Sequence, residues 1–288
     1  QGSDPGIARN RRHPGGPVDA SLPLLRIRGE DGAMIAVLTA YACHPVVLGA
    51  DNLLWTADYP HFVRQTLEEA CPGAVALFMT GCVGDANTGH SAHASIALAA
   101  NPDRTYEAAA RIGRKVAEAA LAASEQSVSD TVTARNGTVV LGFRRRETDL
   151  PEILERRWRE EALTAEPACK NLLGYWADWA RDIAPAEPGP LAARVTVLDW
   201  GGVPIVALPG EIFAETALSI RAALGPGRPA FVIGFADDNP GYIPPAGEFR
   251  HGGYEVDEAH RYYGLAATFA PGSAEALAAC AIELANGS

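Results

Sequence analysis

The order of apolar segments along the chain limits the possible folds more than any other feature. Leu25 and Ile27 alternate with arginines, a Glu-Asp-Gly turn follows, and residues 34–41 run back as a second strand. Gly201-Gly202 separates another pair of strand-like runs. Apolar residues at 58–70 have the spacing of a helix, and the apolar run at 73–81 that comes after them predicts a buried strand. Hairpins mixed with strand–helix steps predict an α/β (mixed α+β) fold, with a layered mixed sheet flanked by helices.

The longest helical pattern runs from about 102 to 127, with Asn101 or Asp103 as its N-cap. Residues 149–184 are also helical and rich in tryptophan, and we interpret them as an insertion or lid over a cleft. Two further helices are expected near the C-terminus. A chain of 288 residues can form one large domain, which we place at 6–288. Residues 1–5 have the composition of a cleavage scar from an expression tag.

Composition excludes some classes of function. The net charge of −11 and the lack of a basic stripe argue against nucleic acid as a partner, and the trio at 144–146 is expected to be a solvated strand end. Five cysteines, an odd number without a CxxC pair, do not form a disulfide framework. No apolar run reaches the roughly 18–20 residues of a membrane span, so we expect a soluble protein. If a signal was removed, the protein could be secreted or periplasmic rather than cytoplasmic.

Polar residues follow several predicted strands. They are His44, the turn after Met79, Glu211 and the turn that contains Tyr242. Ligands on α/β sheets bind outside strand ends, where loops gather distant residues. His, Glu and Tyr can all supply zinc ligands. Each also has a structural explanation: His44 as a satisfied core histidine, and Glu211 as a first-turn acid of a helix.

Four segments, in order, resemble the catalytic domain of the neutral/alkaline ceramidases, especially short bacterial relatives. They read "ACHPVVLG…TADYP", "FMTGCVGDANTG", "LPGEIFAE" and "NPGYIPPAGEFRHGGYE". The opening "NRRHPGGPVDASLPLLRIRG" fits the same relatives. The resemblance implies a zinc-dependent hydrolase of an amide or N-acyl bond, acting on a small-molecule or lipid-like N-acyl substrate.

The same resemblance assigns roles to individual residues. His44, Glu211 and Tyr242 match zinc ligands of the family, so the expected cofactor is Zn²⁺. Tyr254 matches a tyrosine that hydrogen-bonds the developing oxyanion, and Asp58 matches an aspartate near the metal, to which we assign a role in orienting a ligand or its water.

Two positions depart from the family pattern. The first zinc histidine of the family lies upstream of anything in this chain, so we expect either that the chain is a fragment that lacks the N-terminal part or that its metal site is incomplete. The expected protein partners are that missing segment or a second copy of the chain. Asn87 stands near the place of a family serine and could donate a hydrogen bond to a substrate carbonyl. Three functions therefore stay open: an amide hydrolase, a non-catalytic ligand-binding protein, and a metal-dependent esterase or deacylase.

Other polar residues give weaker signals. His90 and His93 lie three positions apart and could face one metal if helical, although a polar loop is the alternative. Cys82 is expected to be buried and inert, and His251 and His260 to be surface or loop residues. The glycine-rich loop at 81–89 lacks the Lys-Ser/Thr of a phosphate-binding loop. We also expect no exposed apolar stripe of the kind that would contact lipid.

Overall fold

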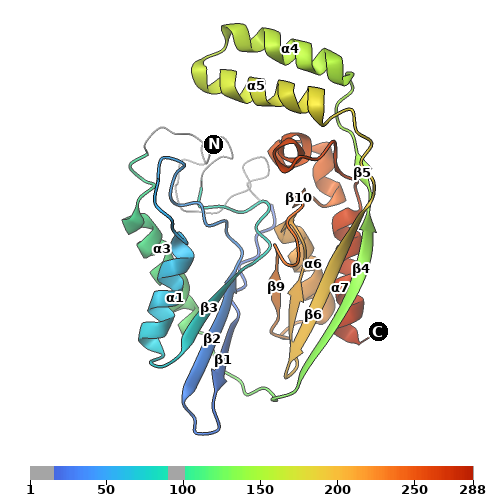
Figure 1. The fold of residues 1–288 in the computed structure, drawn as a ribbon. Helices are drawn as coiled ribbons and strands as arrows, with labels where there is room; N and C mark the ends of the chain where they lie inside the picture. The colour runs from blue at the N-terminus through green and yellow to red at the C-terminus, as the bar shows by residue number, and fades with distance from the viewer. Residues whose placement is uncertain (1–15, 90–100, 288) are drawn as a thin grey trace.

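The computed structural model describes residues 16–89 and 101–287. The predicted tag scar at 1–5 and the histidine pair His90 and His93 therefore lie outside the described residues. Two sheets stand side by side with helices on their outer faces (Figure 1). This arrangement confirms the predicted mixed α/β fold.

The first sheet has the order β1-β2-β3. It consists of β1 (Leu24–Arg28), β2 (Met34–Tyr41) and β3 (Val75–Thr80). β1 pairs antiparallel with β2 through the predicted hairpin, whereas β2 and β3 are parallel. The parallel connection contains α1 (Tyr59–Ala70), as a crossover requires.

The second sheet has the order β4-β6-β7-β9. Its strands are β4 (Val132–Leu141), β6 (Leu191–Trp200), β7 (Val203–Ala207) and β9 (Phe231–Ile233). The Gly201-Gly202 turn joins β6 to β7 in an antiparallel pair, and β7 runs parallel to β9. Two small pairings complete the strands: β8 (Glu211–Ile212) with β10 (Tyr242–Ile243), and β5 (Phe143–Arg144) with β11 (Thr268–Phe269).

Alternation along the strands explains why the chain forms four layers. In β2, Val37 faces a core shared with α1 and α3 (Tyr106–Leu121), while Leu38 faces the second sheet. In β9, Phe231 faces the first sheet, while Val232 packs with α6 (Ala214–Leu224) and α7 (Ser273–Asn286). Side chains of a strand alternate between its two faces. The order of layers is therefore helices, sheet, sheet, helices.

The predicted helical stretch at 149–184 forms a hairpin of α4 (Pro151–Thr164) and α5 (Pro167–Asp182), which lies beyond one end of the two sheets (Figure 1). It has its own small core, in which Trp158 and Trp179 are buried. Whether this hairpin acts as a lid stays a prediction.

Two local predictions were wrong. The helix expected at 102–127 begins only at Tyr106, and its N-cap is Thr105. Asn101 does not cap it, because its side chain accepts a hydrogen bond from the amide of Asp103 in a turn before the helix. Of the two helices expected near the C-terminus, one is α7. The segment before it forms only the short turns η1 (Ala246–Arg250), η2 (Tyr254–Glu258) and η3 (Ala259–Tyr263), because prolines and glycines interrupt it.

No helix among the described residues combines the length and apolar character needed to cross a membrane.

Candidate functional site

The carboxyl ends of four strands meet at one edge of the molecule. β2 and β3 are parallel, as are β7 and β9, so each pair ends on the same side. The amide of Gly234, just after β9, donates to the carbonyl of Thr80 at 3.1 Å, and Gly81 pairs with Ile233. The two sheets are thus joined at this edge, where the segments after each strand come together.

Backbone hydrogen bonds join these post-strand segments. His44 N–H donates to the Ala86 carbonyl at 2.9 Å, and Gly84 N–H donates to the Ile212 carbonyl at 2.8 Å. Gly84 approaches so closely that a Cβ there would lie 2.6 Å from the carbonyl oxygen of Glu211. Only glycine fits at this contact, and the close approach fixes the segment of Glu211 against the loop after β3.

His44 and Glu211 are the two polar side chains at the centre of this edge. Nε2 of His44 lies 3.2 Å from Oε2 of Glu211. The contact lacks hydrogen-bond geometry, so this buried nitrogen has no hydrogen-bond partner among the described residues. The Glu211 side chain is only 5% exposed. Buried nitrogen atoms normally have a hydrogen-bond partner. An imidazole nitrogen that lacks one and lies beside a buried carboxylate forms a pair of groups that can both coordinate a metal ion.

Three tyrosines surround the Glu211 carboxylate. The ring of Tyr242 lies edge-to-face with Tyr254 and with Tyr263, at centroid distances of 5.8 and 6.2 Å. The Tyr263 hydroxyl donates to Oε1 of Glu211. Burial, followed by the negative charge of Glu211, raises the pKa of Tyr242 well above its usual range. Burial likewise raises the pKa of Tyr254, so both phenols are neutral near pH 7.

Asp58 lies at the start of α1 and not at the centre of the site. Its carboxylate accepts the amides of Val47, Leu48 and Tyr59, at 3.2, 2.8 and 2.8 Å. It is buried and has a positive φ of 55°, a conformation that costs energy outside glycine. These contacts fix the chain that follows His44. The role predicted for Asp58 toward a metal ligand stays a prediction.

The loop after β3 carries Asn87 and Asp85. Asn87 is half-buried, and its Oδ1 accepts the amide of Gly89 at 2.9 Å. Asp85 was not among the predicted site residues: its Oδ1 accepts the amide of Ala214 at the start of α6, at 2.8 Å. Burial raises the pKa of Asp85 to about 6. Cys82, in the same loop, is fully buried with a raised thiol pKa, as expected for an inert cysteine.

The described side chains supply a small set of metal donors. Within residues 16–89 and 101–287, no three His, Cys, Asp or Glu side chains gather closely enough to hold a metal ion. The site instead combines one histidine, one glutamate and the phenol oxygens around them. His44, Glu211 and Tyr242 therefore lie together at this edge, whereas their role as zinc ligands stays a prediction.

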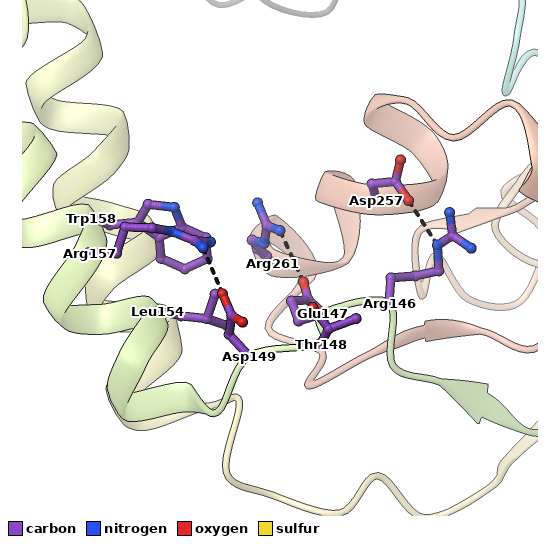
Figure 2. A pocket seen from close by; sticks show the side chains of 9 residues that line it. All are labelled: Arg146, Glu147, Thr148, Asp149, Leu154, Arg157, Trp158, Asp257 and Arg261. Carbon is purple, nitrogen blue, oxygen red and sulfur yellow. Dashed lines mark hydrogen bonds and ion pairs between the residues drawn. The ribbon is translucent and has the colours of Figure 1, made fainter.

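A polar cavity of ≈ 250 Å³ lies between the α4–α5 hairpin and η2 (Figure 2). Three arginines line it, each paired with an acid: Arg146 with Asp257 at 2.8 Å, Arg157 with Asp149 at 2.7 Å, and Arg261 with Glu147 at 3.0 Å. Arg146 was expected to lie in a solvated strand end. That expectation was wrong, because its guanidinium also reaches the Phe249 carbonyl.

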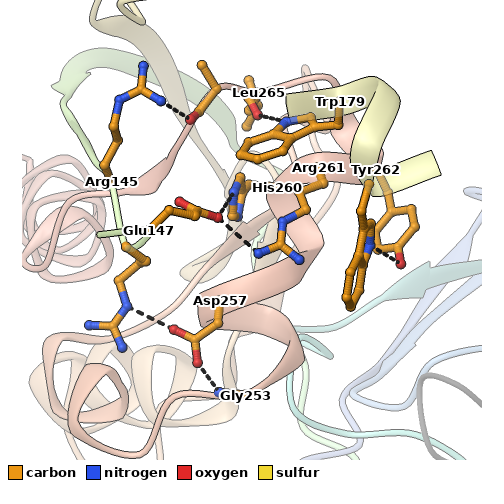
Figure 3. A network of polar contacts seen from close by, with 12 residues as sticks. Arg145, Glu147, Trp179, Gly253, Asp257, His260, Arg261, Tyr262 and Leu265 are labelled. Carbon is orange, nitrogen blue, oxygen red and sulfur yellow. Dashed lines mark hydrogen bonds and ion pairs between the residues drawn. The ribbon is translucent and has the colours of Figure 1, made fainter. Parts of the chain in front are cut away.

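Arg261 and His260 form the centre of a buried network (Figure 3). The guanidinium of Arg261 lies over the rings of Trp158, Trp176 and Trp179, at 5.0, 4.7 and 5.3 Å. His260 was expected at the surface but is only 5% exposed, because its ring packs edge-on against Trp179 and faces Glu147 at 3.3 Å.

The α4–α5 hairpin contacts the segment that carries the site tyrosines. Nε1 of Trp176 donates to the hydroxyl of Tyr262 at 3.0 Å, and Tyr175 stacks on the same ring at 5.3 Å. Tyr262 lies next to Tyr263 and is 5.9 Å from the ring of Tyr254. The hairpin therefore contacts the site through Tyr262.

An exposed apolar tip, defined as Leu53, Leu54 and Trp55, lies between His44 and Asp58 in the sequence. The three residues are 93%, 68% and 103% exposed. The expectation that no such surface exists was therefore wrong. Hydrogen bonds hold the preceding Asn52 against the Leu54 carbonyl and the Tyr106 hydroxyl, so the tip projects from an ordered turn.

No known family profile and no curated protein sequence matches the chain. Solved structures do match. Neutral ceramidase from Pseudomonas aeruginosa superposes with a TM-score of 0.61 at 14% identity, covering 99% of this chain and 51% of that one. A ceramidase complexed with C2 gives a TM-score of 0.60 at 13% identity, covering 98% and 52%. The chain thus has the fold of about half of a neutral ceramidase.

Proposed function

We propose that this protein is a zinc-dependent hydrolase of an amide or N-acyl bond. The observation that supports this most is the buried pair of His44 Nε2 and Glu211 Oε2, 3.2 Å apart at the joined strand ends. The neighbouring structures are ceramidases, and their fold is consistent with an amide hydrolase. In this proposal His44, Glu211 and Tyr242 hold the metal.

The residues of the chain take distinct roles in the reaction. Zinc held by His44, Glu211 and Tyr242 would supply a Lewis acid and would lower the pKa of a bound water towards ~7. Tyr254 is a neutral phenol at pH 7, since tyrosine ordinarily has a pKa of about 10 and burial raises the pKa of Tyr254 further, so it can donate a hydrogen bond to the oxyanion that would develop as water attacks the acyl carbon. Asn87 is a second candidate donor. The C–N bond would then break, a proton of the attacking water would pass to the leaving nitrogen, and the acyl group would be released as a carboxylate.

Asp58 acts indirectly in this proposal. Its carboxylate fixes the amides of Val47 and Leu48, which follow His44 along the chain. We assign it the role of holding the His44 segment in place, so that the imidazole faces Glu211.

A lipid-like N-acyl substrate is the proposed substrate class. Its support in this chain is the exposed apolar tip, Leu53 to Trp55. Tryptophan and leucine at an exposed turn are the side chains that enter the interfacial region of lipid. A metal-dependent esterase is distinguished from an amidase by matched ester and amide substrates with the same acyl chain.

Metal content tests the proposal directly. The protein is purified without chelator, and zinc is measured by elemental mass spectrometry for wild type, His44→Ala and His61→Ala. His61 is exposed on α1, so its variant is the matched control. We expect about one zinc per chain in wild type and the control, and loss of zinc in His44→Ala. A wild type without zinc, or a His44→Ala variant that retains it, contradicts the proposal.

A second candidate function is ligand binding without catalysis. The small donor set favours it, since among residues 16–89 and 101–287 only His44 and Glu211 of the usual ligand types meet at the centre of the site. It predicts binding of N-acyl compounds with no turnover at any zinc loading. Single-turnover assays with zinc-loaded protein separate the two functions.

A further inference from the structure

The two oxygens of the Glu211 carboxylate have different neighbours. Oε2 faces Nε2 of His44 at 3.2 Å. Oε1 accepts the hydroxyl of Tyr263, a residue that no sequence motif singled out. A carboxylate whose oxygens each have a fixed neighbour cannot rotate about its terminal bond without losing both contacts.

Tyr263 is itself held in place. Its ring lies against Gly241, where a Cβ would come within 2.8 Å of the ring. Gly241 has a φ of +102° and accepts the amide of Glu211 through its carbonyl. The same short turn therefore supports the backbone of Glu211 and the ring that contacts its carboxylate.

The two consecutive tyrosines of η3 have separate partners. The hydroxyl of Tyr262 accepts from Trp176 of the α4–α5 hairpin, whereas that of Tyr263 donates to Glu211. This difference provides a natural control. Removing either hydroxyl deletes one hydrogen bond, and only one of the two bonds involves the Glu211 carboxylate.

We propose that Tyr263 is a positioning residue that fixes the Glu211 carboxylate, with Oε1 occupied and Oε2 directed toward His44. The consequence for metal binding rests on the proposed function, in which Glu211 and His44 hold zinc. Hydrogen bonds to ligating carboxylates set their orientation, and removing them weakens metal affinity by about 10–100-fold. Glu211 would then bind through Oε2 alone.

Zinc affinity, measured by competition with a chromophoric chelator, tests the positioning role. We expect Tyr263→Phe to bind zinc about 10–100-fold more weakly than wild type, and Tyr262→Phe to stay within about threefold. The absorption spectrum of the cobalt-loaded protein provides a second measurement, because it reports the geometry around the ion. The spectrum should change in Tyr263→Phe and not in Tyr262→Phe. Unchanged affinity and spectrum in Tyr263→Phe overturn the proposal.

A metal-free measurement separates this proposal from the proposed function. A double-mutant cycle of Tyr263→Phe and Glu211→Ala, in which each substitution removes one partner of the hydrogen bond, is followed by urea unfolding with chelator present. If the unfolding constant of the double variant differs by about fivefold or more from the value expected from the two single variants, the two side chains are coupled, even if wild type binds no zinc. In that case the positioning stands and the zinc proposal fails. Additive changes overturn the positioning of Glu211 by Tyr263, whatever the metal content.

Discussion

Nη2 of Arg261 donates a hydrogen bond to Oε1 of Glu147 at 3.0 Å, and both side chains are less than a tenth exposed. This ion pair links the chain just before α4 to the short helical turns that carry Tyr254 and Tyr263 (Figure 3). The pair therefore connects the α4–α5 hairpin with the part of the candidate site that supplies its tyrosines.

Replacing Glu147 should destabilise the protein strongly. Glu147→Ala leaves the Arg261 guanidinium buried without its counterion, which costs about 3–5 kcal/mol in the free energy of unfolding. Asp149→Ala is the control, because its partner Arg157 is 46% exposed and exposed pairs contribute less than about 1 kcal/mol. Urea unfolding of both variants measures the difference. Equal effects of the two substitutions would contradict the structural role of the buried pair.

Acid should weaken the same network. Burial alone would raise the pKa of Glu147, but hydrogen bonds and charge from His260 and Arg261 outweigh it and lower the pKa to about 2. The Glu147 carboxylate therefore stays ionised to a lower pH in the native state than in the unfolded chain. Its contribution to stability is complete above pH 4.5 and is lost as the pH falls toward 2. Unfolding curves between pH 2 and pH 6 should show this loss in wild type and not in Glu147→Ala.

Asp85 should have the opposite pH dependence. Its pKa is raised to about 6, chiefly by burial, so the native state binds a proton that the unfolded chain releases above pH 4. Ionisation therefore reduces stability as the pH rises from about 4 to 6, by up to about 3 kcal/mol. Asp85→Asn keeps an acceptor for the Ala214 amide and removes the titration. Its stability relative to wild type should rise over this pH range, and a constant difference would exclude the effect.

Gly84 should tolerate no side chain. A Cβ there meets the Glu211 carbonyl at 2.6 Å and the Phe213 ring at 2.7 Å, so Gly84→Ala must displace the segment of Glu211. We expect a loss of about 1–3 kcal/mol together with weaker zinc binding. Gly174→Ala in α5 is the control, because nothing lies within 4 Å of its added methyl group, and it should stabilise the helix by up to about 1 kcal/mol. A Gly84→Ala protein with normal stability would show that this close approach is not required.

The exposed apolar tip should matter only for substrates presented in lipid. The double variant Leu54→Ser/Trp55→Ser removes two apolar side chains, each of which would contribute about 1.5–3 kcal/mol when buried in lipid. The double variant should cleave vesicle-borne N-acyl substrate at least tenfold more slowly and a soluble short-chain amide at the wild-type rate. Leu163→Ser, at an exposed leucine on α4, is the control. An equal loss on both substrates would point to damage at the site itself.

The fold class followed from local pattern because hairpins and strand–helix steps are short-range features. The Gly201-Gly202 turn and the alternation in residues 34–41 are of this kind, and both predicted elements are present. The placement of His44 and Glu211 at strand ends was equally visible, because each follows directly on an apolar run. Their meeting depends on how the two sheets join at Gly81 and Gly234, which no local pattern encodes.

The missed features depend on tertiary contacts. Tyr263 reaches Glu211 because η3 packs against Gly241. The burial of His260 depends on Trp179 of the α4–α5 hairpin, and the contacts of Arg146 depend on Asp257 and Phe249, which are more than 100 positions away. The helix cap at Thr105 was missed because Asn101 has equally suitable chemistry and is used in a turn. Polar residues near glycines have several possible partners, and distant packing selects among them.

His44 follows a strand of the first sheet and Glu211 a strand of the second, so the two sheets contribute one residue each to the central pair. These residues lie in opposite halves of the chain, and contacts between distant segments form late because closing a long loop has a high entropic cost. Neither half can build the pair alone. If the proposed zinc site is correct, recovery of zinc binding during refolding should report the docking of the two sheets and should lag behind the recovery of helix and strand signals.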